Sequence, residues 1–441
     1  MLNINERKNF LITCITIFAS IFLASCSKDN PIEPDSSAAK VAGRISSSGG
    51  LQKTISSSFA QDGVQGATVM LAQVQADGSL KTVSTQNIQT DAAGKFVVET
   101  NLNGASNLVV VATKGATEWK AIVSSKVQSG STVYAPPLSA ESTEEANVYV
   151  KLVSQGHAGD FDEADLKLLL NSQAAVFIHG NSQAQADFIN AFQASVQATI
   201  QASSNSYFGF SSSQIQMMMH SKADAEAGFD TDLYNSSDTD ADNENCRNNY
   251  EGNILNAYAG ANAYTYAELM RIGVTTFINA SASMNSNLRL AIAKSFYTRY
   301  AFVLNFAMKQ QFQAAGATDT QINSVSSAGS VLYASIKNST DLNQIASAFV
   351  QYRSAVKTQI QVTLSSYASI IDTIDSSING TVSTKSVLNT TIGGSISLDA
   401  IINAYITFFS AVKTTTQASL AGASSTQVNA ASQILILSNM N

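Results

Sequence analysis

Residues 90–100 read Thr90-Asp91-Ala92-Ala93-Gly94-Lys95-Phe96-Val97-Val98-Glu99-Thr100. The first half is typical of a turn, because Asp and Gly tolerate the backbone angles that turns require. The second half is rich in aromatic and β-branched residues, which are typical of strands. The stretch therefore predicts a turn that leads directly into a β-strand.

Further strands are predicted on both sides of this stretch. The run Leu108–Thr113 is almost continuously apolar and rich in β-branched residues, which predicts a central, buried strand. The turn Ala76-Asp77-Gly78-Ser79 contains an Asp-Gly pair, which supplies the positive φ of tight hairpins. The other predicted strands are Val41–Ile45, Gly66–Val74, Trp119–Ser124 and Asn147–Leu152. Short strands at this spacing predict a β-sandwich of about seven strands over residues 40–153.

Three pieces of this region resemble the carboxypeptidase regulatory-like domain: Val41-Ala42-Gly43, Val64-Gln65-Gly66-Ala67-Thr68-Val69 and Thr90-Asp91-Ala92-Ala93-Gly94-Lys95-Phe96. The resemblance covers about a quarter of the chain and implies a transthyretin-like sandwich of seven strands. Domains of this family are non-catalytic modules attached to enzymes, receptors and surface proteins. The resemblance therefore implies a fold and no activity.

After Val153 the apolar residues recur with a helical period. Helices are predicted from Asp162 to Gly180, from Ser182 onward, and around Leu288–Phe306 with an end at Gly316. Two more are predicted to begin at caps, one at Asp319 and one at Asp341, and the second of these is expected to run to Gly380. A final helix is predicted over Leu398–Ser419. No proline follows Pro137, and a proline inside a helix costs about 3 kcal/mol. Residues 154–441 are therefore predicted to form a bundle of six to eight helices, which resembles no family known to us. The predicted class is α+β and multidomain, with the sandwich followed by the all-α bundle.

The N-terminus has the pattern of an exported protein. Arg7 and Lys8 precede an apolar run from Phe10 to Ala24, which is shorter than the roughly 20 residues of a membrane span. The run ends in Leu23-Ala24-Ser25-Cys26, which resembles the lipobox of bacterial lipoproteins. That resemblance implies a signal peptide over residues 1–25 and acylation of Cys26, and several acyl chains anchor a protein stably. The alternative is an ordinary signal peptide that happens to precede a cysteine.

The residues after Cys26 resemble sorting signals. Ser27 resembles the pattern of lipoproteins sent to the bacterial outer membrane, and Lys28-Asp29 resembles a surface-export signal. Periplasmic and surface orientations both stay open. Residues 26–39 contain Pro31, Pro34 and several serines, which predicts a flexible tether.

An acidic stretch, residues 222–251, holds nine of the 32 acidic residues of the chain. Four acidic residues in this stretch occupy every second position, as do the oxygen ligands at the start of a calcium-binding loop: Asp238, Asp240, Asp242 and Glu244. Asn243 stands where such a loop needs glycine, and Asn249 where it needs glutamate. Two interpretations follow: a calcium site, or a solvated acidic loop between helices.

The chain has no recognisable catalytic motif. Ser354 and Lys357, like Ser410 and Lys413, have the serine–lysine spacing of β-lactamase-like enzymes, but the accompanying elements are missing. His157, His179 and His220 have no partners at the spacing of a zinc site.

The composition limits the classes of function that the chain can have. A net charge of −7 disfavours a nucleic-acid partner, and 13% charged residues beside 45% hydrophobic ones indicates folded domains. The sequence predicts a lipid-anchored, non-catalytic envelope protein that binds or scaffolds. Its expected partners are the membrane, through Cys26, and an unidentified protein or glycan, with calcium as the one candidate cofactor. An envelope hydrolase with an accessory sandwich and a calcium-stabilised surface adhesin are the alternatives.

Overall fold

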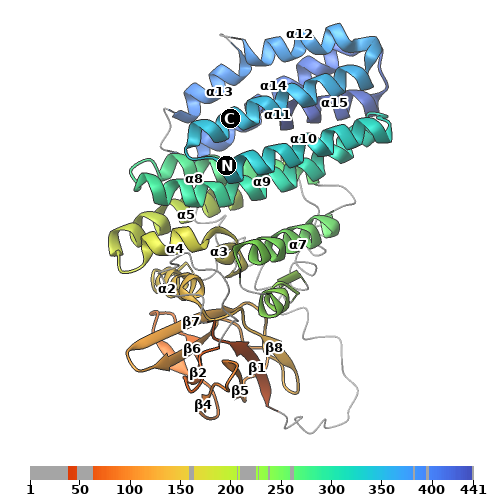
Figure 1. Cartoon of the computed structure of the whole chain (residues 1–441). Coiled ribbons are helices and arrows are strands. Elements are labelled where there is room, and N and C mark those ends of the chain that lie inside the picture. The colour runs from red at the N-terminus through yellow and green to blue at the C-terminus, as the bar shows by residue number, and fades with distance from the viewer. Residues whose placement is uncertain are drawn as a thin grey trace, which may run out of the picture. The chain divides into compact units, whose positions relative to one another are not determined.

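The structure is a computed structural model that describes residues 38–46, 63–157, 163–205, 207–208, 225–226, 228–236, 239–258, 263–380, 383–393 and 397–439. Residues 38–441 form one compact unit. A region of β-sheets, residues 39–134, is followed by a helical region, residues 140–438, which confirms the α+β class (Figure 1). The predicted signal peptide, Cys26 and nearly all of the tether lie outside the described residues.

The strands form two sheets. They are β1 (Ala39–Arg44), β2 (Thr68–Val74), β3 (Leu80–Thr82), β4 (Ile88–Gln89), β5 (Lys95–Thr100), β6 (Leu108–Lys114), β7 (Thr117–Val123) and β8 (Thr132–Tyr134). One sheet has the order β5-β1-β8, and the other has the order β3-β2-β6-β7 with β4 paired to β2. The strand β6 lies between β2 and β7 and its first five residues are buried, so the predicted central strand is confirmed.

The sheet β3-β2-β6-β7 has apolar side chains on both faces. Val110 and Ala121 pack with Val41 and Val98 of the other sheet in one core. Val109 and Ile122 point to the opposite face, because side chains alternate along a strand, and they belong to the core of the helices. The sheet region and the helical region therefore share a hydrophobic core.

Two glycines of the sheet region have a specific structural role. Gly94 has a φ of +71° in the predicted turn, where the Asp91 carboxylate accepts hydrogen bonds from the backbone N–H groups of Ala93 and Lys95. Gly43 pairs with Phe96 across β1 and β5, and a Cβ atom at Gly43 would lie 2.2 Å from Cζ of the Phe96 ring. A side chain at residue 43 would therefore displace this core phenylalanine.

The predicted strand Asn147–Leu152 is wrong, because these residues belong to the helix α2 (Ala140–Ser154). Ser139 caps α2 in a capping box with Ser142, two residues after Pro136-Pro137. The run around Tyr149 alternates like a strand, but the cap fixes a helix whose buried face packs on β7. The last strand therefore ends at Tyr134 rather than near residue 153.

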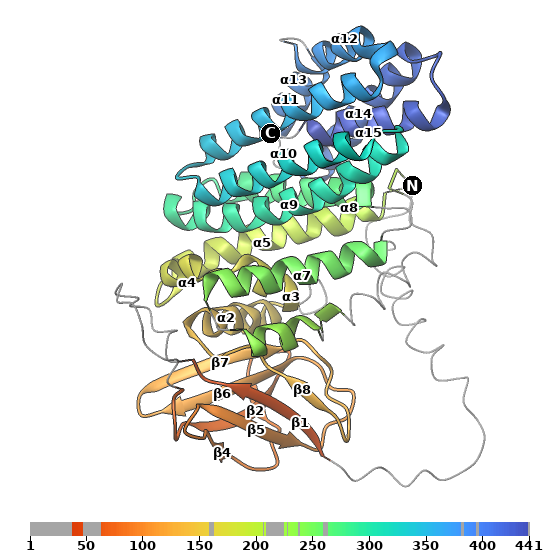
Figure 2. The ribbon, with the colours of Figure 1, turned by 45° about the vertical axis from the view of Figure 1, so that its right-hand side comes forward.

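The described part of the helical region contains more than the expected six to eight helices. They are α3 (Glu163–Leu169), α4 (Ser172–Ile178), α5 (Ser182–Ser203), α7 (Asp240–Tyr258), α8 (Ala263–Ala280), α9 (Ser286–Ala314), α10 (Asp319–Asn338), α11 (Leu342–Thr363), α12 (Ala368–Asn379), α13 (Thr384–Gly393), α14 (Leu398–Ser419) and α15 (Ser425–Ser438). The helix α9 packs against α8, α10 and α15 and so lies inside the helical layers (Figure 2).

Four predicted helix boundaries are wrong. The helix expected from Asp162 to Gly180 is two helices, because the Asn171 side chain caps α4 by accepting a hydrogen bond from the N–H of Ala174. The helix expected to run to Gly380 ends at Thr363, where a 3-10 turn over Ser365–Tyr367 leads into α12. The caps of α5 and α10 are Asn181 and Thr318, each one residue before the predicted Ser182 and Asp319.

The acidic stretch is not a solvated loop where the structure describes it. Residues 228–235 and 240–258 are helical. Asp230 is 0% exposed and Glu251 is 1% exposed, and Glu251 accepts a 2.7 Å hydrogen bond from Nε of Arg299. Apolar neighbours in the same segment, such as Phe229 and Tyr250, bury this part of the chain.

Asp341 is a confirmed helix cap, and Asp319 provides a matched control. The Asp341 carboxylate accepts a hydrogen bond from the N–H of Gln344, so Asp341→Ala should lower the free energy of unfolding by about 1 kcal/mol. Asp319 follows the capping residue of α10, so Asp319→Ala should lose only a few tenths of a kcal/mol. Urea unfolding of both variants measures the difference, and equal losses would contradict the assignment of the caps.

Candidate functional site

The structure does not bring the predicted calcium ligands together. Asp238 lies outside the described residues, and Asp240 begins α7 with its side chain undescribed. The Asp242 carboxylate accepts a 2.9 Å hydrogen bond from the Thr239 hydroxyl. The Glu244 carboxylate instead accepts a hydrogen bond from the Tyr333 hydroxyl. Within the described ranges no group of three or more His, Cys, Asp or Glu side chains is arranged to hold a metal ion. The calcium site stays a prediction.

His179, Ser354 and Lys357 make local structural contacts, and His220 lies outside the described residues. His179 ends α4, and its Nδ1 lies 2.7 Å from the Glu144 carboxylate. Lys357 pairs with Asp372 at 2.5 Å, whereas the Ser354 hydroxyl donates to the carbonyl of Val350. Ser354 and Lys357 therefore bond to different groups and form no dyad.

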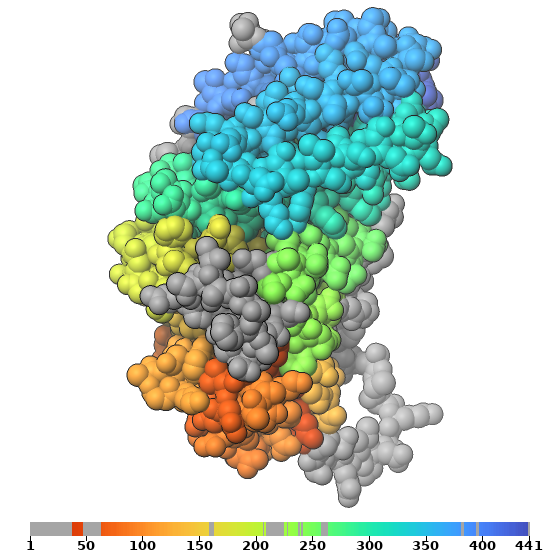
Figure 3. Space-filling view, in the orientation of Figure 1, coloured from red at the N-terminus to blue at the C-terminus, as the bar shows by residue number. Residues whose placement is uncertain are grey.

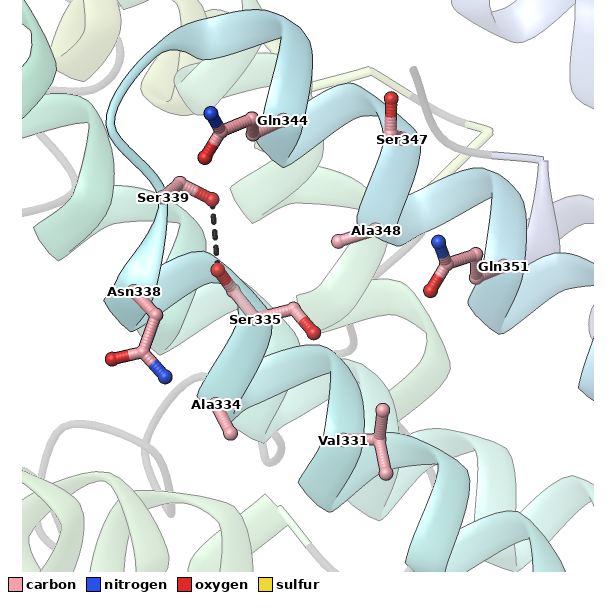
Figure 4. A pocket seen from close by; sticks show the side chains of 9 residues that line it. All are labelled: Val331, Ala334, Ser335, Asn338, Ser339, Gln344, Ser347, Ala348 and Gln351. Carbon is pink, nitrogen blue, oxygen red and sulfur yellow. Dashed lines mark hydrogen bonds between the residues drawn. The ribbon is translucent and has the colours of Figure 1, made fainter.

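Two open grooves flank the helix α11. The first lies between α10 and α11 and has a volume of about 470 Å³ (Figure 4). The second lies between α11 and the start of α12 and has a volume of about 550 Å³. In the space-filling view, α10 and α11 form a continuous outer surface, coloured cyan to light blue (Figure 3).

The first groove is lined by uncharged side chains. Its polar groups are the hydroxyls of Ser335, Ser339 and Ser347 and the amides of Asn338, Gln344 and Gln351. Val331, which is 60% exposed, and the small residues Ala334 and Ala348 complete the lining. The second groove has the same character, with Val362 55% exposed and Asp372 neutralised by Lys357. This surface can donate and accept hydrogen bonds without attracting a charged ligand.

Local helix geometry builds the groove. Val331, Ala334, Ser335 and Asn338 recur every three or four residues, so they share one face of α10. The turn at the end of the groove is fixed by two hydrogen bonds. Ser339 Oγ donates to the Ser335 carbonyl (Figure 4), and Gln344 Oε1 accepts from the N–H of Thr340. The groove is therefore held open by a rigid connection between α10 and α11.

A buried ion pair lies apart from the grooves, on α8. Glu268 and Arg271 are 0% and 1% exposed, and Arg271 Nη1 lies 3.6 Å from the Glu268 carboxylate. The Arg271 guanidinium donates to the carbonyls of Ile436 and Asn439 and lies 5.2 Å from the centre of the Tyr405 ring. Neither carboxylate oxygen of Glu268 has a hydrogen-bond partner among the described residues. Burial raises the pKa of Glu268 to about 7, although Arg271 acts in the opposite direction.

Comparison with protein families, curated proteins and solved structures finds no match to this chain. Function must therefore be inferred from the residues themselves. In the described part of the chain, no helix combines the length and the hydropathy that crossing a membrane requires.

Neither the grooves nor the buried ion pair is among the features that the sequence predicts. The faces of α10 and α11 did carry a usable signal, because Ser, Ala, Asn and Gln recur there at helical spacing without charge. Glu268 and Arg271 gave no such signal, since an acid and a base three residues apart are typical of a solvated helix surface.

Proposed function

We propose that this chain is a lipid-anchored protein of the bacterial outer membrane with a non-catalytic binding or scaffolding role. The anchor rests on the residues Leu23-Ala24-Ser25-Cys26 after an apolar run. The binding role rests on the uncharged grooves beside α11. An uncharged glycan or an uncharged protein segment has the hydroxyl and amide groups that such a surface can bind.

The sheet region is a spacer or docking module in this proposal. Two sheets that enclose one core support a transthyretin-like sandwich of the carboxypeptidase regulatory-like kind. The glycine and phenylalanine of the quoted turn motif, Gly94 and Phe96, lie where such a sandwich needs a tight turn and a core residue. The helical region carries the specific binding surface.

Labelling with palmitate tests the anchor. The Cys26→Ser variant should lose the label and leave the membrane fraction, because Cys26 supplies the acylated sulfur. The Cys14→Ser variant is the matched control, since Cys14 lies inside the predicted signal peptide and should keep both properties unchanged. Label that persists in Cys26→Ser would refute lipid anchoring.

Photo-cross-linking in living cells tests the groove. A photo-activatable side chain at Ser347, which is exposed in the first groove, should yield a discrete adduct with an envelope protein or glycan. The same group at Ser410, exposed on α14 outside both grooves, should not. Absence of an adduct at residue 347, or equal adducts at both residues, would reject the groove as the binding surface.

A further inference from the structure

A lysine and an aspartate face each other in the interior, between α3 and the helical residues 228–235. The side chains of Lys167 and Asp230 are 1% and 0% exposed, and Lys167 Nζ lies 2.5 Å from Asp230 Oδ1. Lys167 Nζ also donates to the hydroxyl of Ser124, which follows β7, at 2.6 Å. The amine is therefore held against one oxygen of the carboxyl group, away from water.

The backbone holds the other carboxyl oxygen in place. The N–H of Ser124 donates to Asp230 Oδ2 at 2.9 Å, and the N–H of Ser125 also hydrogen-bonds the Asp230 carboxyl group. A fixed backbone donor such as the Ser124 N–H on Oδ2 stabilises an oxyanion when a nucleophile adds to a carbonyl carbon. The geometry thus prepares the Asp230 carbon for attack as well as pairing its charge.

Burial favours the neutral form of the Asp230 carboxyl group. It raises the pKa of Asp230 above its ordinary value, because an ionised carboxylate is poorly solvated in the interior. Proton transfer from the Lys167 ammonium to Asp230 leaves a neutral amine beside a neutral acid. A neutral amine is a nucleophile. A buried neutral pair also avoids the desolvation cost that two buried charges would have.

A third buried group can move the protons. Glu145 of α2 is 4% exposed and interacts electrostatically with both Lys167 and Asp230. Burial, reinforced by the nearby Glu141, raises the pKa of Glu145 to about 8. Glu145 is therefore protonated at neutral pH, and its pKa is close to the pH at which a group can both donate and accept a proton.

We propose that Lys167 and Asp230 condense to form an intramolecular isopeptide bond. The lone pair of Lys167 Nζ forms a bond to Cγ of Asp230, and the C=O π electrons move to Oδ2, where the N–H of Ser124 receives the charge. Glu145 protonates Oδ1, which leaves as water when the electrons on Oδ2 reform the carbonyl. Glu145 then recovers its proton from the nitrogen. The sum is one ammonium and one carboxylate giving one amide and one water, with no oxidant or cofactor.

The fold supplies the proximity that the reaction needs. Two groups held in contact by a folded interior react as if at very high concentration, and exclusion of water favours the amide over its hydrolysis. The chain also contains a natural control for this argument. Lys357 and Asp372 lie at the same 2.5 Å separation, but their side chains are 28% and 57% exposed. Distance alone is therefore not expected to link them.

Peptide mapping of the full chain, purified from cells and denatured before proteolysis, tests the proposal. The peptides that hold Lys167 and Asp230 should be recovered as one branched species, lighter than their sum by one water. The peptides of Lys357 and Asp372 should be recovered unlinked. Separate, unmodified peptides for Lys167 and Asp230 in the wild-type chain would overturn the proposal.

Variants distinguish the formation of the bond from the proton transfer by Glu145 that assists it. Lys167→Met and Asp230→Ala each lack one reacting group, so neither should lose a water. Each variant should therefore be heavier by one water than the mass calculated for a linked chain. Glu145→Gln keeps both reacting groups and the pairing of Lys167 with Asp230, so the variant should fold. Because it lacks the proton-transfer group, it should lose most of the linked species. A wild-type extent of linkage in Glu145→Gln would overturn the proton-transfer role of Glu145, and a linked mass in Lys167→Met would overturn the bond itself.

Discussion

Arg271→Ala is expected to lower the free energy of unfolding by about 3–5 kcal/mol, because it leaves Glu268 buried without a compensating charge. Arg271 also holds the carbonyls of Ile436 and Asn439, so the variant loses hydrogen bonds between α8 and the end of α15. Its guanidinium further contacts the rings of Tyr405 and Phe408. Chemical unfolding at pH 8, where Glu268 is ionised, should show the largest loss.

A matched control removes a cation from the surface instead. Lys413 is exposed on α14, so Lys413→Ala should change the free energy of unfolding by less than about 0.5 kcal/mol. Similar losses in Arg271→Ala and Lys413→Ala would contradict the structural role given to the buried pair. Arg271→Ala combined with Glu268→Gln should recover part of the loss, because no buried charge is then left unpaired.

Glu268→Gln is expected to remove most of the pH dependence of stability that Glu268 causes. The folded-state pKa of Glu268, about 7, lies above its ordinary value of 4.5. The folded protein therefore holds this proton more tightly than the unfolded chain, and the free energy of unfolding falls as the pH rises from 4.5 through 7. The size of the shift corresponds to roughly 3 kcal/mol, a pH-dependent loss that glutamine cannot show because it does not titrate.

Urea unfolding between pH 5 and pH 8 measures this effect (the two ends bracket the pKa of about 7). Wild-type stability should decline across the range, and the decline should be much smaller in Glu268→Gln. Some decline should persist, because Glu145 has a raised pKa of about 8 and contributes with the same sign. Glu118→Gln, at an exposed carboxylate, should follow the wild type. Parallel curves for the wild type and Glu268→Gln would refute the prediction.

Local sequence patterns predicted the elements that local forces determine. The turn at Asp91–Gly94, the strand Lys95–Thr100 and the helix Leu398–Ser419 lie where the sequence placed them. The strand follows a turn rich in Asp and Gly, and the helix has an apolar period that fits only a helix. Residues 147–152 show the opposite case, because their alternation fits a strand and the capping box at Ser139 decides for a helix.

Features that depend on tertiary contacts could not be predicted in this way. Asp230 lies in an acidic stretch that is typical of a solvated loop, yet it is fully buried against Lys167, 63 residues earlier in the chain. Glu268 likewise gives no local sign that its carboxylate is enclosed. A single sequence records which residues are charged, but only the packing of distant helices determines which charges lose contact with water.

The apolar outer face of β6 and β7 has a consequence for how this chain can evolve. Val109, Val111 and Ile122 lie in the same core as apolar side chains of the helices, and α2 packs directly against β7. A gene fragment that encoded the strands without these helices would encode a sheet with a bare apolar face, prone to self-association. Recombination can therefore transfer the strands to a new protein only together with at least the first helices that cover them.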